Sequence, residues 1–228
     1  VIYPNISKMV AENNIKGLKR IISEAIGIIN LLVIPATVGA MLFSKEIVGL
    51  LFGRGAFTPE AIQMTGIALF YYSIGMPPLS LRSVASRSFY AHQDTKTPMI
   101  NATIGVVINI ILNIILSRFM GLGGLALATS ISAIVTAILM FITLRKKIGH
   151  FGLLEISRSF IKISIASVIM GLFAFGSFKY LGLYLTQNVA LVVAIIIGAL
   201  TYTIIIYFLK IPEVESTLGI LRKRFERK

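Results

Sequence analysis

Long apolar stretches separated by short polar segments dominate the hydrophobic pattern of this chain. A membrane-spanning helix needs about 20 mainly apolar residues. Six segments meet this requirement, at approximately residues 22–43, 61–90, 99–116, 122–144, 161–181 and 189–209. The pattern therefore predicts an all-α, polytopic membrane helix bundle with six transmembrane helices.

Proline positions predict bends in two of these helices. Pro77 and Pro78 remove two backbone donors from the middle of the second segment, so we expect a kink there. Pro35 should bend the first segment for the same reason. The second segment should begin after Thr58, a capping residue that is followed by a first-turn proline and by Glu60 at the positive end of the helix dipole.

Three shorter stretches do not have the length of a span. Residues 44–52 predict a short interfacial helix. Residues 1–16 lack the basic start and the apolar core of a signal peptide, and we expect them to be the end of a truncated helix and a loop, which makes the chain a fragment. Residues 212–228 combine helically spaced apolar residues with basic ones. This pattern is typical of an amphipathic helix on an anionic membrane face, or alternatively of a frayed charged terminus.

Composition supports a membrane environment. Hydrophobic residues make up 56% of the 228 residues and charged residues 14%, against roughly 25% charged in soluble domains. The net charge is +13, but the basic residues lie between apolar stretches, so membrane lipids with anionic headgroups are the expected partner and nucleic acid is not. The chain has no cysteine, and its two histidines fall in different predicted loops, so no thiolate, zinc or haem site is expected.

The distribution of basic residues predicts the orientation. With six spans, 18 of the 22 Lys and Arg residues fall on one side of the membrane. Only four fall on the other side, namely Lys45, Arg54, Arg118 and Lys179. The positive-inside rule then places both ends of this chain in the cytoplasm.

The acidic residues do not predict an enzyme. Most of the nine lie at expected helix ends or in loops, where capping and headgroup contacts explain them. The sequence shows neither paired carboxylates nor a glycine-rich phosphate loop. We therefore expect a protein that is not an enzyme.

Two arginines within the second segment are the strongest candidates for substrate binding. Arg82 and Arg87 lie in its cytoplasmic half together with Ser83 and Ser86. A charge in hydrocarbon is costly, so these side chains should line a water-filled cavity, where a guanidinium can bind phosphate through two parallel hydrogen bonds. The alternative is that they extend toward lipid headgroups.

Polar residues on the third and fourth segments suggest a second site. Asn109 and Asn113 lie one turn apart, and Asn113 and Thr129 are each eight residues from Gly121, so they should lie at matching depth. With the Leu125 carbonyl they offer hard oxygen ligands of the kind that suit Na⁺. The alternative is hydrogen bonding between the two helices, which the absence of a carboxylate favours.

Three short motifs resemble the MurJ/MviN family of lipid II flippases, in the wider superfamily of multidrug and oligosaccharidyl-lipid exporters. They are LFGRGAFT at residues 51–58, RSFYAHQDTKTP at residues 87–98 and GLALATS at residues 124–130. The resemblance covers essentially the whole chain. It implies that the six spans correspond to helices nine to fourteen of a fold with two lobes around a central cavity and two additional C-terminal helices.

The resemblance also implies a function and its partners. Residues 17–148 would form the C-terminal lobe, and residues 149–211 would form a helix pair whose apolar groove holds a polyprenyl tail. The substrate would be an undecaprenyl-pyrophosphate-linked muropeptide, flipped across the bacterial cytoplasmic membrane by alternating access. The N-terminal lobe of the same protein would be missing, so the chain alone should be inactive.

The resemblance leaves other points open. The family's cation-site positions match Asn109, Asn113, Leu125 and Thr129, but some relatives have an acid at the position of Asn113. Two other functions are alternatives: export of a different lipid-linked oligosaccharide or of a drug, and a non-transport scaffold in cell-wall assembly.

Overall fold

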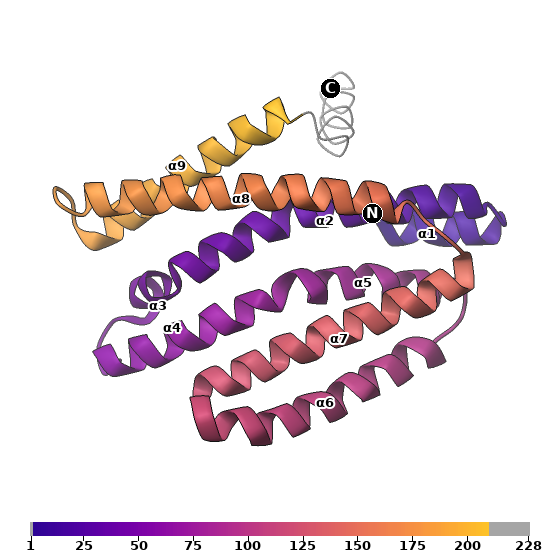
Figure 1. The fold of residues 1–228 in the computed structure, drawn as a ribbon, viewed down its shortest axis with the longest axis horizontal. Helices are drawn as coiled ribbons and strands as arrows, with labels where there is room; N and C mark the ends of the chain where they lie inside the picture. The colour runs from indigo at the N-terminus through magenta and orange to yellow at the C-terminus, as the bar shows by residue number, and fades with distance from the viewer. Residues whose placement is uncertain (1, 210–228) are drawn as a thin grey trace.

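The computed structural model describes residues 2–209, which form nine α-helices joined by short turns (Figure 1). The helices are α1 Ile2–Ala11, α2 Ile15–Leu42, α3 Ser44–Phe52, α4 Pro59–Ile74, α5 Met76–Ala91, α6 Lys96–Met120, α7 Leu122–Ile148, α8 Leu153–Leu181 and α9 Gln187–Phe208. The predicted tail helix, residues 212–228, lies outside the described residues.

The helices lie in layers that can be followed in Figure 1 from α9 to α6. α9 packs on α8, and α8 packs on α2. On its other side α2 contacts α4 and α5, which pack on α7, and α6 packs against α7. Thus α2 separates the C-terminal pair α8 and α9 from the remaining long helices.

Five helices of the described chain, namely α2, α6, α7, α8 and α9, are long and apolar enough to cross a membrane. The prediction of an all-α membrane bundle is confirmed, but the segment 61–90 is not one continuous helix. It forms two helices of 16 residues each, α4 and α5. Each is about 24 Å long at 1.5 Å per residue, less than the roughly 30 Å of a bilayer core, so a crossing here requires α4 and α5 together, one after the other through Gly75.

The break between α4 and α5 has a local cause. Pro77 and Pro78 lack the N–H groups that would continue the helical hydrogen bonds. The Gly75 amide bonds to a carbonyl three residues earlier at 3.0 Å, so the Tyr71 carbonyl receives a different donor, the Ser130 hydroxyl of α7, at 2.6 Å. A Cβ on Gly75 would lie 2.8 Å from that hydroxyl oxygen, so the glycine permits the close approach of α7.

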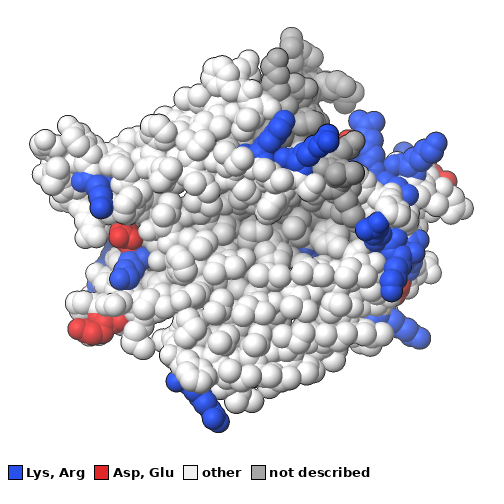
Figure 2. Space-filling model, viewed as in Figure 1, with Lys and Arg blue, Asp and Glu red and all other residues white. Residues whose placement is uncertain are grey.

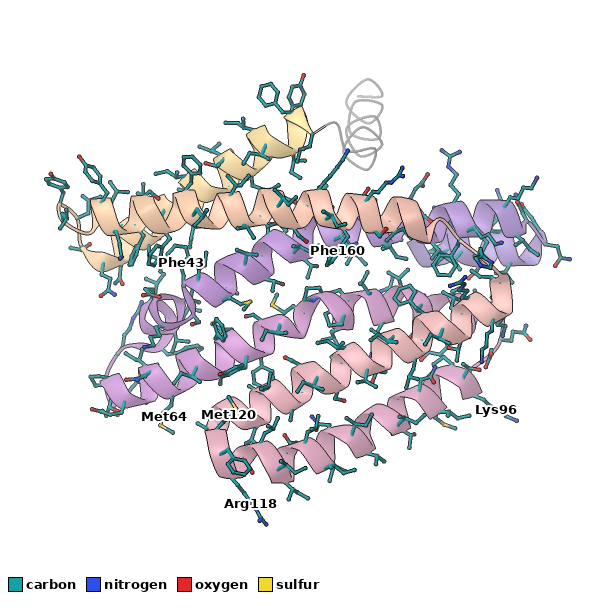
Figure 3. All side chains as sticks on the ribbon, in the orientation of Figure 1. Phe43, Met64, Lys96, Arg118, Met120 and Phe160 are labelled. Atoms are coloured by element: carbon teal, nitrogen blue, oxygen red, sulfur yellow. The ribbon has the colours of Figure 1, made fainter. Side chains whose placement is uncertain are left out.

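Apolar side chains are both buried and exposed, as expected for a membrane protein. A buried cluster joins α1, α2, α5 and α7 at one end of the molecule, and includes Leu18, Ile22, Phe89 and Leu144. Along α6, α8 and α9 many large apolar side chains instead remain more than half exposed, as Figure 3 shows for the outer faces of these helices. These faces suit contact with lipid acyl chains.

Basic side chains concentrate at one end of the molecule. In Figure 2 the blue side chains gather where α1, the C-terminal end of α7 and the first turns of α8 lie in Figure 1. At the opposite end in Figure 1 lie α3, the start of α4 and the end of α8, segments that contain or flank Lys45, Arg54 and Lys179. Figure 3 shows Lys96 and Arg118 at the two ends of α6. The helix directions thus reproduce the separation of charges that the sequence predicts.

Candidate functional site

One face of α5 borders a cavity of about 380 Å³. Arg82, Ser83, Ser86 and Arg87 all line it, because a spacing of three to four residues places them on the same side of the helix. The walls are completed by other residues of α5 and by α6 and α7, namely Leu79, Tyr90, Pro98, Ala102 and Met140. The structure therefore brings together the four residues selected from the sequence, while their role in binding stays a prediction. We call this cavity the arginine pocket.

The arginine pocket is electropositive. Arg82 is half-buried and Arg87 is exposed. Among the described side chains, no carboxylate lies within ion-pair distance of either guanidinium, since the ion pairs present involve other residues. Both arginines are therefore available to an anionic ligand, with two serine hydroxyls beside them as hydrogen-bond donors.

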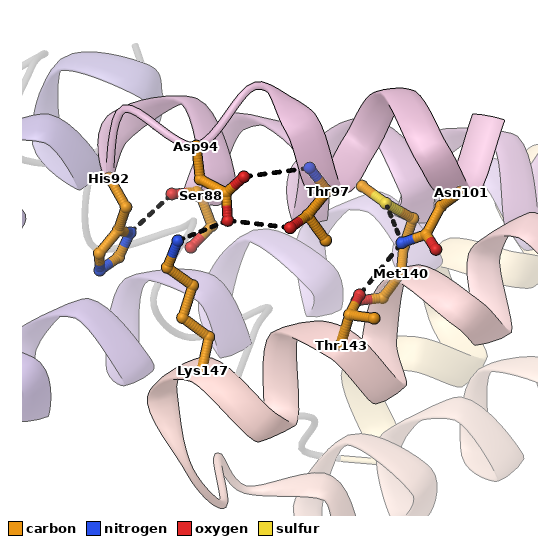
Figure 4. Close-up of polar contacts among 8 residues, drawn as sticks. All are labelled: Ser88, His92, Asp94, Thr97, Asn101, Met140, Thr143 and Lys147. Atoms are coloured by element: carbon orange, nitrogen blue, oxygen red, sulfur yellow. Dashed lines mark hydrogen bonds and ion pairs between the residues drawn. The ribbon is translucent and has the colours of Figure 1, made fainter. Parts of the chain in front are cut away.

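The turn between α5 and α6 is held in place by Asp94 (Figure 4). One carboxylate oxygen accepts a hydrogen bond from the Thr97 amide at 3.0 Å, which caps the start of α6. The other accepts bonds from the Thr97 hydroxyl at 3.0 Å and from the Lys147 ammonium of α7 at 2.6 Å. The hydrogen bond from Lys147, followed by that from the Thr97 amide, lowers the pKa of the Asp94 carboxyl to about 2.

A second polar contact joins the same helices one turn further along. The buried Asn101 amide of α6 donates to the Thr143 hydroxyl at 3.1 Å and contacts the Met140 sulfur at 3.3 Å (Figure 4). Because Met140 also borders the arginine pocket, these contacts help to fix the pocket wall.

Sequence reasoning missed Asp94, Asn101 and Lys147 as residues that support the site. For Asp94 a signal was available, because an aspartate three residues before Thr97, at the start of an apolar run, is typical of a helix cap. The other two residues gave no comparable signal, since the partners of Asn101 lie on another helix and the partner of Lys147 lies in a turn far from it along the chain.

The residues proposed to hold Na⁺ also converge. The Asn113 amide donates to Asn109 Oδ1 at 3.0 Å, and the Asn109 amide donates to the Thr129 hydroxyl at 3.3 Å. That hydroxyl donates to the Leu125 carbonyl at 3.0 Å. The groups therefore form the hydrogen-bonded chain between α6 and α7 that the alternative interpretation expects. Within this described group, Asn113 Oδ1 is buried without a hydrogen-bond partner and is thus available to a cation, while Na⁺ binding stays a prediction.

A second cavity, of about 420 Å³, lies between α2, α3, α8 and α9. Its lining is almost entirely apolar, with residues such as Leu32, Ala36, Gly39, Met170, Ile195 and Gly198. We call it the apolar groove. It contains no charged side chain among its lining residues, in contrast to the arginine pocket.

Known proteins resemble this chain in sequence over most of its length. The sequence model of a family described as "Lipid II flippase MurJ" matches residues 1–199. The chain belongs to the MurJ family. It is 36% identical over 206 residues to a probable lipid II flippase MurJ from Thermotoga maritima, covering 89% of this chain and 40% of that protein. It is 33% identical to the lipid II flippase MurJ of Thermosipho africanus, covering 84% of this chain and 38% of that protein.

A solved structure supports the same assignment. A lipid II flippase MurJ in an inward closed conformation superposes with a TM-score of 0.74 and 32% identity, over 90% of this chain and 41% of that chain. The protein is thus a multi-pass membrane protein of the bacterial MurJ family, and it spans about 40% of the length of the relatives it matches.

The MurJ-like motifs occupy different places in the fold. LFGRGAFT forms the end of α3 and the loop before α4. RSFYAHQDTKTP forms the end of α5, the turn and the start of α6, and it supplies Arg87, Tyr90 and Pro98 to the arginine pocket. The same motif supplies Asp94 and Thr97, which hold the turn. One of the motifs that indicate the family therefore also builds part of the candidate site.

Proposed function

We propose that this chain forms one lobe and the two C-terminal helices of a flippase that moves lipid II across the bacterial cytoplasmic membrane by alternating access. The observation that carries the proposal is the arginine pocket, where Arg82 and Arg87 border one cavity without a described carboxylate partner. An undecaprenyl-linked pyrophosphate carries negative charge on its phosphate oxygens, which guanidinium forks bind through paired hydrogen bonds. Ser83 and Ser86 would add neutral donors.

The apolar groove supports the same proposal from the other end of the substrate. A polyprenyl chain needs an uncharged surface, and the lining of the groove between α2, α8 and α9 provides one. The groove and the arginine pocket belong to different layers of the bundle. The charged and the apolar parts of one lipid would therefore be bound by different regions of the chain.

The chain alone should not transport. Alternating access requires two halves to rock against each other, and the matched relatives are more than twice as long as this chain. The partner would be an N-terminal lobe of the same protein. Both ends of the present chain would face the cytoplasm, since the charge-rich ends of its helices lie on one side.

The proposal can be tested in a chimera in which this chain replaces the matching segment of the Thermosipho africanus flippase. Losing a hydrogen bond to a charged group costs about 1.5–3 kcal/mol. We therefore expect Arg82→Ala to reduce lipid II flipping about tenfold or more, with partial retention in Arg82→Lys. The matched control is Arg118→Ala, because Arg118 is exposed and lies at the end of α6 away from the arginine pocket. This variant should flip lipid II at the normal rate.

The measurement is the accumulation of lipid II in the inner leaflet after depletion of the native flippase. Flipping by Arg82→Ala equal to that of the Arg118→Ala control would contradict the role of the arginine pocket. Normal cell growth without lipid II flipping by the chimera would instead favour another lipid-linked substrate or a scaffold.

A further inference from the structure

The proline within α2 leaves a backbone carbonyl without its helical donor. Pro35 lies inside α2 and has no N–H, so the Leu31 carbonyl, four residues earlier, cannot form the usual hydrogen bond. In a membrane helix such a carbonyl needs a partner within the protein. The hydroxyl of Tyr202, from α9, donates to it at 2.7 Å.

The threonines on either side of Tyr202 bond within their own helix. The Thr201 and Thr203 hydroxyls donate to Ile197 and Ala199, carbonyls of α9 itself, each at 2.8 Å. Tyr202 also packs beside a buried cluster of Ile34, Ile163, Ala166 and Ile206. Unlike these threonines, Tyr202 uses its hydroxyl to join α9 to α2 next to Pro35.

This contact lies at the apolar groove. Leu31, Pro35 and Tyr202 all line the groove, together with the α9 residue Ala199. Toward the start of α9, a second buried cluster contains Leu191, Ala194, Phe43 and Ala174. α9 is thus held by two clusters, with groove residues between them, and Tyr202 provides a hydrogen bond at one of the two.

We propose that Tyr202 is a positioning residue that holds α9 against α2 at Pro35 and thereby sets the width of the apolar groove. The inference rests on the proposed function only in taking a polyprenyl chain as the ligand of that groove. Because the carbonyl is free only when residue 35 is proline, the hydroxyl of Tyr202 should matter in the presence of Pro35 and not in its absence.

The test uses one introduced thiol: this chain has no cysteine of its own, and any cysteine in the N-terminal part of the chimera is replaced by serine. Ala199→Cys, made in the chimera in detergent micelles, reports access to the groove by its rate of reaction with N-ethylmaleimide. Tyr202→Phe should change that rate by at least threefold. Pro35→Ala supplies an amide to the Leu31 carbonyl, so adding Tyr202→Phe in that background should change the rate less than 1.5-fold.

Tyr207→Phe is the matched control, because Tyr207 lies on the same helix with its side chain exposed. It should leave the rate unchanged. The inference would be overturned if Tyr202→Phe changed the reaction rate equally with Pro35 present and in the Pro35→Ala background. It would also be overturned if Tyr202→Phe had no effect on the rate with Pro35 present. Each variant is first checked for a single monodisperse peak, and the Pro35→Ala pair decides the question if Tyr202→Phe alone is unstable.

A second arm separates this inference from the proposed function. Undecaprenyl phosphate added before the reagent should protect the introduced thiol at position 199 severalfold if a polyprenyl chain occupies the groove. Protection without a Tyr202 effect would overturn the positioning role alone. A Tyr202 effect without protection would overturn the polyprenyl ligand and leave the positioning role in place.

Discussion

At the scale of single residues, Asp94 links the start of α6 to the end of α7. Its ordinary pKa of 3.8 is lowered to about 2, first by the Lys147 hydrogen bond and then by the Thr97 amide. A carboxyl whose pKa is lower in the folded state stabilises the fold above its unfolded pKa. That contribution is therefore complete above about pH 4–5 and is lost as the pH falls toward 2.

We expect Asp94→Asn to lower the melting temperature at pH 7, since it weakens a helix cap that is worth about 1 kcal/mol and removes an ion pair. The difference from the unmodified chain should shrink as the pH falls from about 4 toward 2, where the aspartate itself becomes protonated. Thermal unfolding in detergent at several pH values measures this. Glu12→Gln, which removes the exposed Lys8–Glu12 pair at 3.9 Å, is the control and should change little. A difference that is independent of pH would contradict the role of the ionised carboxylate.

The group around Asn113 yields a prediction about ions. Its members bond to one another, apart from the Asn113 oxygen, and none carries a negative charge. We therefore expect replacement of choline by Na⁺ to leave the melting temperature of the unmodified chain nearly unchanged. Asn113→Asp places a carboxylate where the asparagine oxygen has no partner, and should make the melting temperature rise with Na⁺. Asn109→Ser is a suitable uncharged control. A clear Na⁺ effect in the unmodified chain would show that the neutral oxygens suffice.

Part of this residue-level chemistry was predictable. Arg82 and Arg87 stood out because charge within an apolar segment is costly, and the helical period placed Ser83 and Ser86 beside them. That Met140 lines the arginine pocket was not predictable, because it is an ordinary apolar residue on another helix, far from α5 along the chain. Nor was Lys147 distinguishable from its basic neighbours, since its pairing with Asp94 depends on how α7 lies against the turn.

At the scale of helices, packing depends on glycines that allow close approach. Gly105 of α6 faces α7, and its carbonyl accepts a hydrogen bond from Ser132 at 2.6 Å. A Cβ on Gly105 would lie only 2.2 Å from the Thr136 hydroxyl oxygen. In membranes helices associate largely through such contacts between small residues.

Gly105→Ala should therefore destabilise the protein by about 1–3 kcal/mol, the usual cost of overpacking. Gly176→Ala is the matched control, because Gly176 lies within α8 and a Cβ there would meet nothing within 4 Å. The control should be neutral or stabilising, since alanine favours a helix over glycine by about 1 kcal/mol. Chemical or thermal unfolding of both variants in the same detergent distinguishes them, and equal stabilities would contradict the close packing of α6 on α7.

The apolar pattern predicted most helices but not every boundary. α3 begins at Ser44 and ends at Phe52, as predicted, because polar and glycine residues flank a short apolar run. For the segment 61–90 the apolar pattern does not predict the break between α4 and α5. Its apolar character continues through Gly75, so hydropathy alone predicts one uninterrupted helix. The division into α4 and α5 depends on the two prolines and on the Ser130 contact from α7, which is a tertiary interaction.

At the scale of the whole molecule, the direction of each helix can be checked against the charges. Of the 16 basic residues within residues 2–209, 12 lie toward the end where α1 meets α2, α5 meets α6 and α7 meets α8. The order of the layers was not predictable from these charges. The charges indicate on which side of the membrane each helix ends, but not which helices are neighbours. The position of α2 between the pair α8 and α9 and the helices α4 to α7 is therefore known only from the structure.

The orientation predicts which loops face the cell exterior. Single cysteines give a clean readout in the chimera once any cysteine of its N-terminal part is replaced by serine, since this chain has none. Exposed sites are available at Glu12 and His150 on the basic side and at Ala56 and Leu183 on the other. In intact cells producing the chimera, a membrane-impermeant maleimide should label Ala56→Cys and Leu183→Cys. Glu12→Cys and His150→Cys should react only after permeabilisation, because their loops carry most of the positive charge. Labelling of His150→Cys and Leu183→Cys from the same side would mean that α8 does not cross the membrane, whereas a complete reversal of the pattern would contradict the inferred orientation and leave the bundle intact.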